Sequence, residues 1–396
     1  MNGVSVNTGY ILAIARGHNS GACLLKDGEI VFAIEEERLS RHKYDGGPLA
    51  SMIKTLDYTD KIDTLVIAHT QTLADSAARI DFTGDDVYTG MARKLGLIDP
   101  KQFIYNHPQV VDLATIHHKL HAGCAFYRSG FDSAVALIVD GAGTFFRLDN
   151  NGQHTIGYEV ESIIDCEYPY NLRTLWKHMG TTDMIRYSNM DTDLMDPLSG
   201  PEKINLIVSD RAGITKAYEA VTEYCGFSAI EAGKTMGLFP YGESNDKIPN
   251  LFETYENGIS LVRRDVIVPT YPNSAVVNAN LFEELDYNSD GDKTLLQNRR
   301  DMAYALQTQT QEEMVKLIRK AVEMTGKKNV VISGGYGLNC VANYYYLEQL
   351  RDEDINLYVE PVSNDAGTSI GAALIYYHHT TNSKNKSSSN LYLGPQ

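Results

Sequence analysis

The sequence predicts an α/β protein built from two structurally related units. The first observation is a pattern that occurs twice, about 125 residues apart: a strand, a polar glycine turn, a second strand, and a hairpin into a third. The second is a pair of later strands that each run into a glycine-rich loop opening a helix. The third is the length, since 396 residues exceed what one hydrophobic core usually serves.

The first unit is expected over residues 9–130. Apolar runs around a polar glycine turn and an Asp27-Gly28 hairpin predict three strands, at residues 10–15, 22–25 and 30–34. The charged run at 35–38 follows the third strand and is interpreted as a solvated surface. Near the end of the unit, residues 117–126 are expected to form a helix.

The second unit is expected over residues 131–380 and begins with the same pattern. Its expected strands lie at 134–139, at a run through Leu148, at a run towards Val160 after an Asn151-Gly152 hairpin, at 329–332 and at 355–359. Its expected helices lie at 301–325, 338–350 and 368–378. Residues from about 166 to 298 are irregular and are interpreted as insertions that shape an acceptor pocket. Residues 381–396 have the composition of a linker tail.

The charge balance and the cysteines exclude several classes of protein. The 35 Lys and Arg against 51 Asp and Glu give a net charge of −16, which argues against a dedicated duplex-binding or membrane-surface protein. The five cysteines lie far apart and form no C-x-x-C pair, so we expect neither a disulfide framework nor a zinc ribbon. No apolar run approaches the ~20 residues that cross a bilayer, and no signal peptide precedes the first strand. A cytoplasmic protein without a membrane partner is therefore expected.

Two histidines and two aspartates form a predicted metal site. His117 and His121 lie one helical turn apart, so their imidazoles share one face of the helix, although a solvated histidine pair would show the same spacing. Asp140 and Asp365 each follow a predicted strand at a glycine-rich loop and would enter the same cleft if the repeat folds these loops around it. Such a set suits Fe(II), Zn(II) or Mn(II). His118 points about 100° away from His117 and is not expected to be a ligand.

The glycine turns at strand ends predict an anion site. Loops 333–337 and 361–367 each lead from a strand into a helix, so their N–H groups and the helix dipole would face an anion. The Gly233-Lys234-Thr235 sequence lacks the upstream glycine of a Walker loop, and no Gly-x-Ser-x-Gly elbow occurs. The sequence therefore favours an anion or nucleotide site of another kind.

Six motifs occur in the order that is found in the O-carbamoyltransferases that tailor nodulation factors and antibiotics. They are Gly17-His18-Asn19-Ser20-Gly21-Ala22 with Glu35-Glu36-Glu37-Arg38, His117-His118-Lys119-Leu120-His121-Ala122, Asp140-Gly141-Ala142-Gly143-Thr144, Gly233-Lys234-Thr235-Met236-Gly237-Leu238-Phe239-Pro240-Tyr241-Gly242, Gly334-Gly335-Tyr336-Gly337-Leu338-Asn339-Cys340, and Asn364-Asp365-Ala366-Gly367. The match covers roughly residues 10–377, so the chain resembles the N-terminal lobe of that family, which is related to the tRNA threonylcarbamoyl transferases.

The resemblance implies an actin/sugar-kinase/Hsp70-like fold, with two ribonuclease-H-like subdomains whose mixed sheets lie around a central cleft. It assigns a divalent metal to His117, His121, Asp140 and Asp365, with Fe(II) as the expected ion and Zn(II) or Mn(II) as alternatives. His18 and Lys43 match catalytic positions near the carbamoyl phosphate or adenylate. The adenosine and its phosphate are assigned to Glu231, Gly141, Gly143, Gly334, Gly335 and Asn339.

The resemblance also implies the reaction and its partners. A C-terminal lobe makes carbamoyl adenylate from carbamoyl phosphate and ATP with Mg²⁺, and the N-terminal lobe passes the carbamoyl group to an acceptor hydroxyl. Full members continue well beyond the Leu393-Gly394-Pro395 element, so the adenylate-forming lobe is expected in a longer product or in a partner. The expected acceptor is a sugar or antibiotic hydroxyl, or a hydroxymethylated pyrimidine as a nucleotide or in DNA, and a homodimer is left open.

Three other functions compete with this interpretation. A tRNA threonylcarbamoyl transferase needs a basic surface for its substrate, which the net charge of −16 disfavours. A sugar-kinase-like phosphotransferase would use Mg-ATP without a histidine pair. A non-catalytic nucleotide-binding scaffold would be favoured if metal analysis found no ion.

Overall fold

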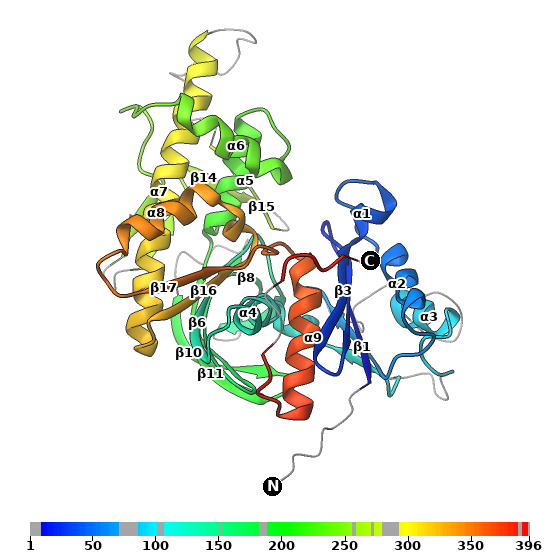
Figure 1. Cartoon of the computed structure of the whole chain (residues 1–396). Helices are drawn as coiled ribbons and strands as arrows, with labels where there is room; N and C mark the ends of the chain where they lie inside the picture. The colour runs from blue at the N-terminus through cyan, green and yellow to red at the C-terminus, as the bar shows by residue number, and fades with distance from the viewer. Residues whose placement is uncertain are drawn as a thin grey trace.

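The computed structural model describes residues 9–70, 86–100, 107–150, 153–181, 188–255, 259–270, 273–278, 293–386 and 390–394, and the structural statements below concern these residues. They form two lobes, each built on one large sheet, with two helices between the sheets (Figure 1). The predicted Asn151-Gly152 turn lies outside the described residues.

The first lobe is built on a five-stranded sheet in the order β3-β2-β1-β4-β5. Strands β1, β2 and β3 are antiparallel neighbours, whereas β4 runs parallel to β1 and β5 runs parallel to β4. The strands span Tyr10–Ala15, Gly21–Lys26, Glu29–Glu35, Thr64–Ala68 and Val110–Asp112. The first three confirm the predicted strands, and Asp27 and Gly28 turn the hairpin with φ angles of 52° and 89°.

The second lobe repeats this order in a larger sheet, β10-β11-β9-β8-β6-β16-β17, with β7 paired to β8. Within it, β9-β8-β6-β16-β17 corresponds to β3-β2-β1-β4-β5, because β6, β8 and β9 are antiparallel neighbours, β16 runs parallel to β6 and β17 runs parallel to β16. The repeated mixed order confirms the predicted α/β fold with two ribonuclease-H-like subdomains. These strands span Ser133–Val139 (β6), Phe145–Asn150 (β7), Gln153–Glu167 (β8), Asn171–Thr181 (β9), Ser188–Asp196 (β10), Gly200–Ser209 (β11), Asn329–Ser333 (β16) and Asn356–Val359 (β17).

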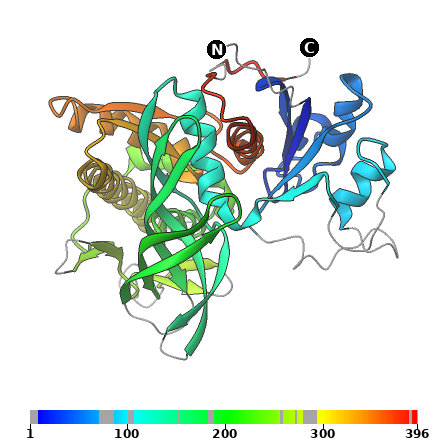
Figure 2. The ribbon, with the colours of Figure 1, turned by 90° about the horizontal axis from the view of Figure 1, so that it is seen from below.

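Helices α4 (His117–Arg128) and α9 (Ala366–Thr381) fill the space between the two sheets. Figure 2 shows α9 end-on, between the first sheet and α4. Every residue of α4 is buried, and apolar residues of both helices share one core with β1 and β6. The two helices approach closely at a glycine, since a Cβ atom on Gly371 would lie 1.8 Å from Leu120 O.

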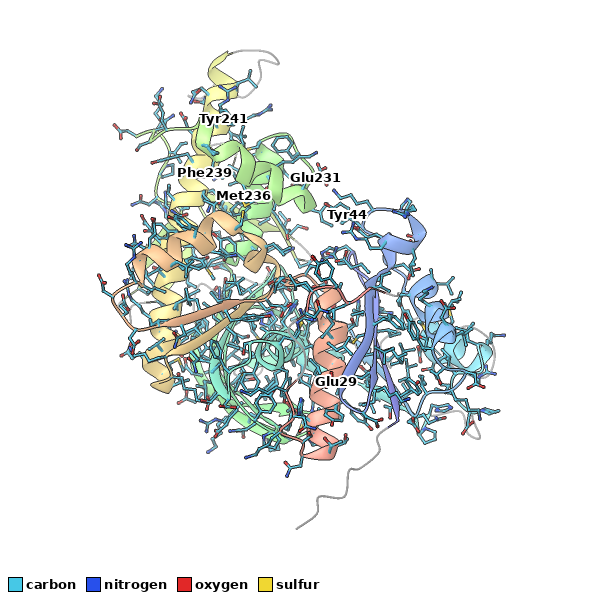
Figure 3. The ribbon with its side chains drawn as sticks, in the orientation of Figure 1. Glu29, Tyr44, Glu231, Met236, Phe239 and Tyr241 are labelled. Atoms are coloured by element: carbon cyan, nitrogen blue, oxygen red, sulfur yellow. The ribbon has the colours of Figure 1, made fainter. Side chains whose placement is uncertain are left out.

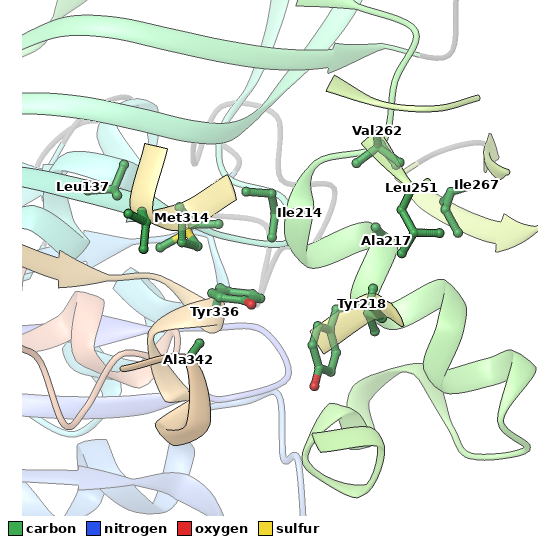
Figure 4. Packing of buried hydrophobic residues seen from close by; sticks show 14 of the residues in the cluster. Leu137, Ile214, Ala217, Tyr218, Leu251, Val262, Ile267, Met314, Tyr336 and Ala342 are labelled. Carbon is green, nitrogen blue, oxygen red and sulfur yellow. The ribbon is translucent and has the colours of Figure 1, made fainter. Parts of the chain in front are cut away.

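Of the remaining helices, the first lobe contributes α1 (Glu36–Ser40), α2 (Leu49–Lys54) and α3 (Val87–Lys94). The second lobe contributes α5 (Ile214–Tyr224), α6 (Ala232–Leu238), α7 (Lys293–Thr325) and α8 (Cys340–Gln349). Helix α7 packs on β6 and β16, and α5, α6 and α8 pack on α7. Figure 4 shows Ile214 of α5 and Met314 of α7 in one core with Tyr336, which lies in the loop after β16. Within the described ranges, no helix is both long and apolar enough to cross a membrane.

The segment 166–298 is interpreted from the sequence as irregular insertions, but the structure corrects this, because the segment forms much of the second lobe. It supplies β9, β10 and β11, the helices α5 and α6, and the start of α7. It also forms two small hairpins, whose strands span Phe252–Thr254 (β12), Ser260–Val262 (β13), Ile267–Thr270 (β14) and Ser274–Val277 (β15). Strand β9 pairs with β8, and β11 pairs with both β9 and β10. The strands β9, β10 and β11 of this segment are therefore held in place by pairing with one another and with β8.

The tail returns to the first lobe at the outer edge of its sheet. The N–H of Ala33 in β3 donates a hydrogen bond to the carbonyl oxygen of Leu393 at 2.7 Å. The Leu393 side chain packs against the core that surrounds α4 and α9. The tail therefore extends the first sheet by one backbone contact beside β3.

Candidate functional site

The four predicted metal ligands converge between the two lobes. His117 and His121 lie in the first turns of α4, and their Nε2 atoms are 3.2 Å apart. Asp365, the N-cap residue of α9, places Oδ1 3.5 Å from His117 Nε2 and 3.6 Å from His121 Nε2. Asp140 follows β6 and places Oδ2 3.6 Å from His117 Nε2. One ligand atom from each residue lies within 4.8 Å of the others, a spacing that can hold one divalent metal ion.

Burial excludes the alternative of a solvated histidine pair. The exposed fractions are 2% for His117, 0% for His121 and 6% for Asp140. Buried ionisable groups are normally paired or bound to a metal, because an isolated buried charge is costly. Neighbouring groups fix two of the ligands: Gly335 N–H donates to Asp140 Oδ1 at 2.9 Å, and Ser333 Oγ lies 3.4 Å from His121 Nδ1. The donor set and its supports fit a metal site.

His118 points away from this cluster, as its position on the helix predicts. Its Nδ1 lies 2.7 Å from Ser162 Oγ on β8, and the ring is fully buried. Burial lowers the pKa of His118 to about 3, so this imidazole is neutral over the physiological range. His118 therefore packs behind the cluster rather than joining it.

The carboxylates dominate the electrostatics of the cluster. Burial by itself would lower the pKa of His117, but its hydrogen bonds to Asp140 and Asp365 and the charges of these residues raise that pKa to about 10. Burial by itself would raise the pKa of each aspartate, but His117 holds the pKa of Asp140 below its ordinary value. Hydrogen bonds to His117 and His121 hold the pKa of Asp365 well below its ordinary value. Without a metal, the cluster therefore keeps a proton on His117 at neutral pH.

Metal binding is expected to strengthen as pH rises, because the ion must displace the proton from His117. For one displaced proton, the apparent dissociation constant should fall about tenfold per pH unit between pH 7 and 9, below the pKa of about 10. Titration of the metal-free chain with metal in competition with a chromogenic chelator measures this dissociation constant at each pH. An exposed-histidine variant, His379→Ala, should show the same slope, and a flat profile for both proteins would contradict the prediction.

The raised pKa of His117 also makes the stability of the metal-free fold depend on pH. The folded pKa of His117 is raised from 6.5 to about 10, so its contribution to stability is fully present below pH 6.5 and is lost as pH rises through 10. Urea unfolding at several pH values would show this loss in the metal-free chain. It should be smaller in a His117→Ala variant.

The cluster lies at one side of a cleft between the lobes, with a volume of about 380 Å³. Asp140 and Asp365 line this cleft together with Tyr44 from the first lobe and Met236 from the second. Figure 3 shows Tyr44 of the first lobe facing Glu231 of the second lobe. The structure thus places two of the four predicted metal ligands, Asp140 and Asp365, on the wall of this cleft.

His18 and Lys43, the predicted catalytic residues, both line the cleft from the first lobe. His18 lies in the turn between β1 and β2, with Nδ1 3.9 Å from Asp365 Oδ2 and 56% of its side chain exposed. Lys43 lies in the loop between α1 and α2, with Nζ 4.6 Å from the centre of the Tyr44 ring. An exposed imidazole beside the ligand cluster can contact a bound substrate, and the ammonium adds a positive charge at the mouth.

The acidic run after β3 supports the loop between α1 and α2. Glu36 is 2% exposed, and its carboxylate accepts hydrogen bonds from the N–H groups of Ala50 at 2.6 Å and Ser51 at 2.7 Å. Glu37 accepts a hydrogen bond from Tyr44 N–H at 3.0 Å. The expectation of a charged surface holds for Arg38, whose side chain is 66% exposed. It is wrong for Glu36, because the free N–H groups at the start of α2 need an acceptor.

Gly334 and Gly335 bring the loop after β16 against the end of β6. Gly334 has a φ of 92°, and a Cβ atom there would lie 2.4 Å from Val139 O. The N–H of Gly335 donates to Asp140, and Gly335 lines the cleft. These two predicted nucleotide-binding residues therefore also orient a metal ligand.

Gly141 and Gly143 lie on the loop after β6 but face different surroundings. A Cβ atom on Gly141 would lie 3.0 Å from Glu219 Oε1, a residue that lines the cleft. Gly143 N–H donates to Glu159 O at 2.9 Å, and a Cβ atom there would lie 2.5 Å from Glu159 Oε2. The amide of Gly143 is thus engaged within the protein, and this glycine permits close packing on a buried carboxylate.

Asn339 and Glu231 complete the predicted nucleotide-binding residues. Asn339 lines the cleft, and its side chain caps α8 by accepting from Ala342 N–H at 3.0 Å and donates to Gln307 Oε1 at 2.9 Å. Glu231 pairs with Lys234 Nζ at 2.6 Å. Among the described residues, its neighbours in sequence line the cleft, but Glu231 itself does not.

Helix α5 contributes cleft residues that the sequence did not indicate. Thr215, Tyr218 and Glu219 all line the cleft, and within the described residues Thr215 Oγ1 is buried without a hydrogen-bond partner. Lys216 Nζ holds Glu219 Oε2 at 2.7 Å. The apolar spacing along 214–224 would have predicted the helix, but nothing local shows that its N-terminal turns face the cleft.

Comparisons with known proteins agree with the motifs. A family model described as carbamoyltransferase N-terminus matches residues 107–374. An uncharacterized protein of Synechocystis, sll1178, is 26% identical over 425 residues, which cover 98% of this chain and 61% of that protein. The nodulation protein NolNO of Sinorhizobium fredii is 26% identical over 371 residues, which cover 90% of this chain and 46% of that protein. The chain thus spans less than two thirds of the length of these relatives.

Among solved structures, full-length HypF in the phosphate- and nucleotide-bound form is similar with a TM-score of 0.48 and 14% identity, over 94% of this chain and 55% of that one. The family match is the stronger finding because it spans more than half of the chain and contains all four cluster residues. The chain belongs to the carbamoyltransferase family, in the part described as its N-terminus.

Proposed function

We propose that the chain transfers the carbamoyl group of carbamoyl adenylate to the hydroxyl of an acceptor. The observation that carries the proposal is the buried cluster of two histidines and two aspartates at the side of a 380 Å³ cleft, in a chain of the carbamoyltransferase family. A cleft of this size suits a nucleotide-sized ligand. The cluster would hold the metal ion at one side of that cleft.

A divalent ion held by His117, His121, Asp140 and Asp365, with Fe(II) as the expected ion and Zn(II) or Mn(II) as alternatives, would supply Lewis-acid polarisation. The chain itself supplies the proton chemistry. In the transfer, the acceptor oxygen bonds to the carbamoyl carbon, the bond from that carbon to the AMP oxygen breaks, and the hydroxyl proton passes to His18. His18 is suited to this role because its ring is exposed beside Asp365.

The AMP leaving group carries negative charge that the cleft must stabilise. Lys43 lines the cleft and places an ammonium at its mouth. The loop at Gly334 and Gly335 approaches the end of β6 closely, which keeps backbone rather than side chains beside Asp140. We assign the phosphate end of the adenylate to this loop and to Lys43.

The adenylate itself is made, in this proposal, from carbamoyl phosphate and ATP with Mg²⁺ outside these 396 residues. Supporting this, the chain spans 61% and 46% of the lengths of the two relatives above. The acceptor is a sugar or antibiotic hydroxyl, or a hydroxymethylated pyrimidine as a nucleotide or in DNA. The net charge of −16 favours a small acceptor over a tRNA.

The test offers carbamoyl adenylate to the metal-loaded chain with a panel of these acceptors and follows products by mass spectrometry. We expect a mass gain of one carbamoyl group on at least one acceptor class. A His18→Ala variant should be slower by about 10²- to 10⁴-fold, the range for loss of a general base. The control is His42→Ala, an exposed histidine in the next loop, which should keep the wild-type rate. If the wild type transfers the carbamoyl group and the His18→Ala variant does so at the same rate, His18 is not the general base.

A further inference from the structure

A carboxylate and an ammonium on α5 lie beside the cluster of two histidines and two aspartates, and neither group belongs to the predicted site. Glu219 lines the cleft, and its Oε2 accepts a hydrogen bond from Lys216 Nζ at 2.7 Å. The side chains are 25% and 10% exposed, respectively, so both are largely removed from water. Lys216 therefore fixes the Glu219 carboxylate and neutralises much of its charge.

The other carboxylate oxygen of Glu219 faces the loop that carries Asp140. A Cβ atom on Gly141 would lie 3.0 Å from Glu219 Oε1 and 3.4 Å from Lys216 Nζ. Among the described residues, Oε1 accepts no hydrogen bond, so it is an oriented acceptor at the wall of the cleft. Burial raises the pKa of Glu219, Lys216 lowers it, and the charge of Asp140 raises it, as expected for a carboxylate close to both groups.

The chemistry of the carbamoyl group matches this acceptor. The group is planar and carries an NH₂ with two hydrogen-bond donors, which need a partner once they leave water. An acetyl group has almost the same size, but its methyl has no donor. A fixed acceptor beside the cluster would therefore discriminate between the carbamoyl and the acetyl group. An enzyme rejects an analogue that leaves a buried polar group of the enzyme unpaired.

We propose that Glu219 Oε1 accepts a hydrogen bond from the carbamoyl NH₂ and so selects carbamoyl adenylate over acyl adenylates, with Lys216 as the positioning residue. The inference rests on the proposed function and names a specificity-determining residue of the same site. No covalent bond to Glu219 forms in this step. Its role is to orient the group that is transferred and to exclude groups without an NH₂.

The test compares carbamoyl adenylate with acetyl adenylate on the metal-loaded chain. Stopped-flow displacement of a fluorescent AMP analogue gives the dissociation constants, and AMP release with enzyme in excess gives the rates. For the wild type we expect acetyl adenylate to bind about 10- to 100-fold more weakly, the range for a hydrogen bond to a charged group. In Glu219→Met, which has a similar length but no acceptor, the ratio should fall to within about threefold.

Two variants separate specificity from stability. Glu219→Gln keeps a carbonyl acceptor and should retain most of the wild-type ratio. Glu223→Met makes the same change one turn later on the exposed face of α5, and it should leave ratio, rate and metal content unchanged. Metal content and circular dichroism of each variant show that the fold and the cluster remain.

The outcomes distinguish this inference from the proposed function. If Glu219→Met weakens both adenylates equally, Glu219 supports the cleft only, and the inference is overturned while the proposed function stands. If the wild type binds the two adenylates equally, the inference is also overturned. If the metal-loaded wild type binds neither adenylate and releases no AMP, the proposed function fails, and the inference fails with it.

Discussion

The double variant His117→Ala with Asp365→Ala is expected to bind no metal and to lose carbamoyl transfer by about 10³-fold or more. His117 Nε2 lies within 3.6 Å of Asp140 and of Asp365, and Asp365 also contacts His121, so these two substitutions remove half of the cluster and most of its contacts. Loss of metal-ion polarisation costs several kcal/mol of transition-state stabilisation, which corresponds to at least this loss of rate.

Metal content by mass spectrometry and transfer from carbamoyl adenylate measure the two effects separately. The matched control, His379→Ala with Asp352→Ala, also removes one histidine and one aspartate, but both are exposed and outside the cleft. It should keep the metal and the wild-type rate. If the cluster variant retained bound metal and full transfer, the metal-assisted mechanism would have to be dropped.

Gly371→Val is expected to destabilise the fold by about 3 kcal/mol and to disrupt the metal cluster at a distance. A Cβ atom at Gly371 would lie 1.8 Å from Leu120 O, a backbone atom of α4 that no rotamer change can move. Insertion of atoms into such a contact costs about 1–3 kcal/mol, and valine adds two methyl groups beyond the Cβ. Because Asp365 lies at the start of α9 and His121 lies on α4, separating the helices pulls the ligands apart.

Urea unfolding gives the stability change, and metal titration gives the effect on the cluster. The control is Gly237→Val in α6, where a Cβ atom would meet nothing within 4 Å. It should change stability by less than about 0.5 kcal/mol, since valine and glycine differ little in helix propensity. Equal effects of the two variants would show that the close contact between α4 and α9 does not matter.

Local patterns in the sequence were sufficient for many elements. The hairpin at Asp27 and Gly28 depends on two adjacent residues that tolerate positive φ, and the structure confirms it. The spacing of His117 and His121 places both rings on one face of a helix, wherever that helix lies in the fold. The strands of the repeat were also predicted, because each is a continuous apolar run between turn residues.

Long-range pairing explains what the sequence did not indicate. Strand β11 is held by β9 on one side and by β10 on the other, and these pairings join separate parts of the chain. Glu36 looks like one of three surface glutamates until the N–H groups of Ala50 and Ser51 are placed against it. Glu219 likewise becomes a cleft residue only when α5 lies beside the loop at Gly141.

The sequence by itself determined the two repeated strand units, the helical histidine pair and the aspartates at strand ends, since each follows from residues close together along the chain. Only the tertiary structure decided that Asp140 and Asp365 meet His117 at 3.6 and 3.5 Å, and that Glu36 and Glu219 face inward. The physical reason is that α4 and α9 pack against each other between the two sheets, at a glycine contact that joins distant parts of the chain. No local pattern encodes that contact, because its energy comes from burying both helices at once.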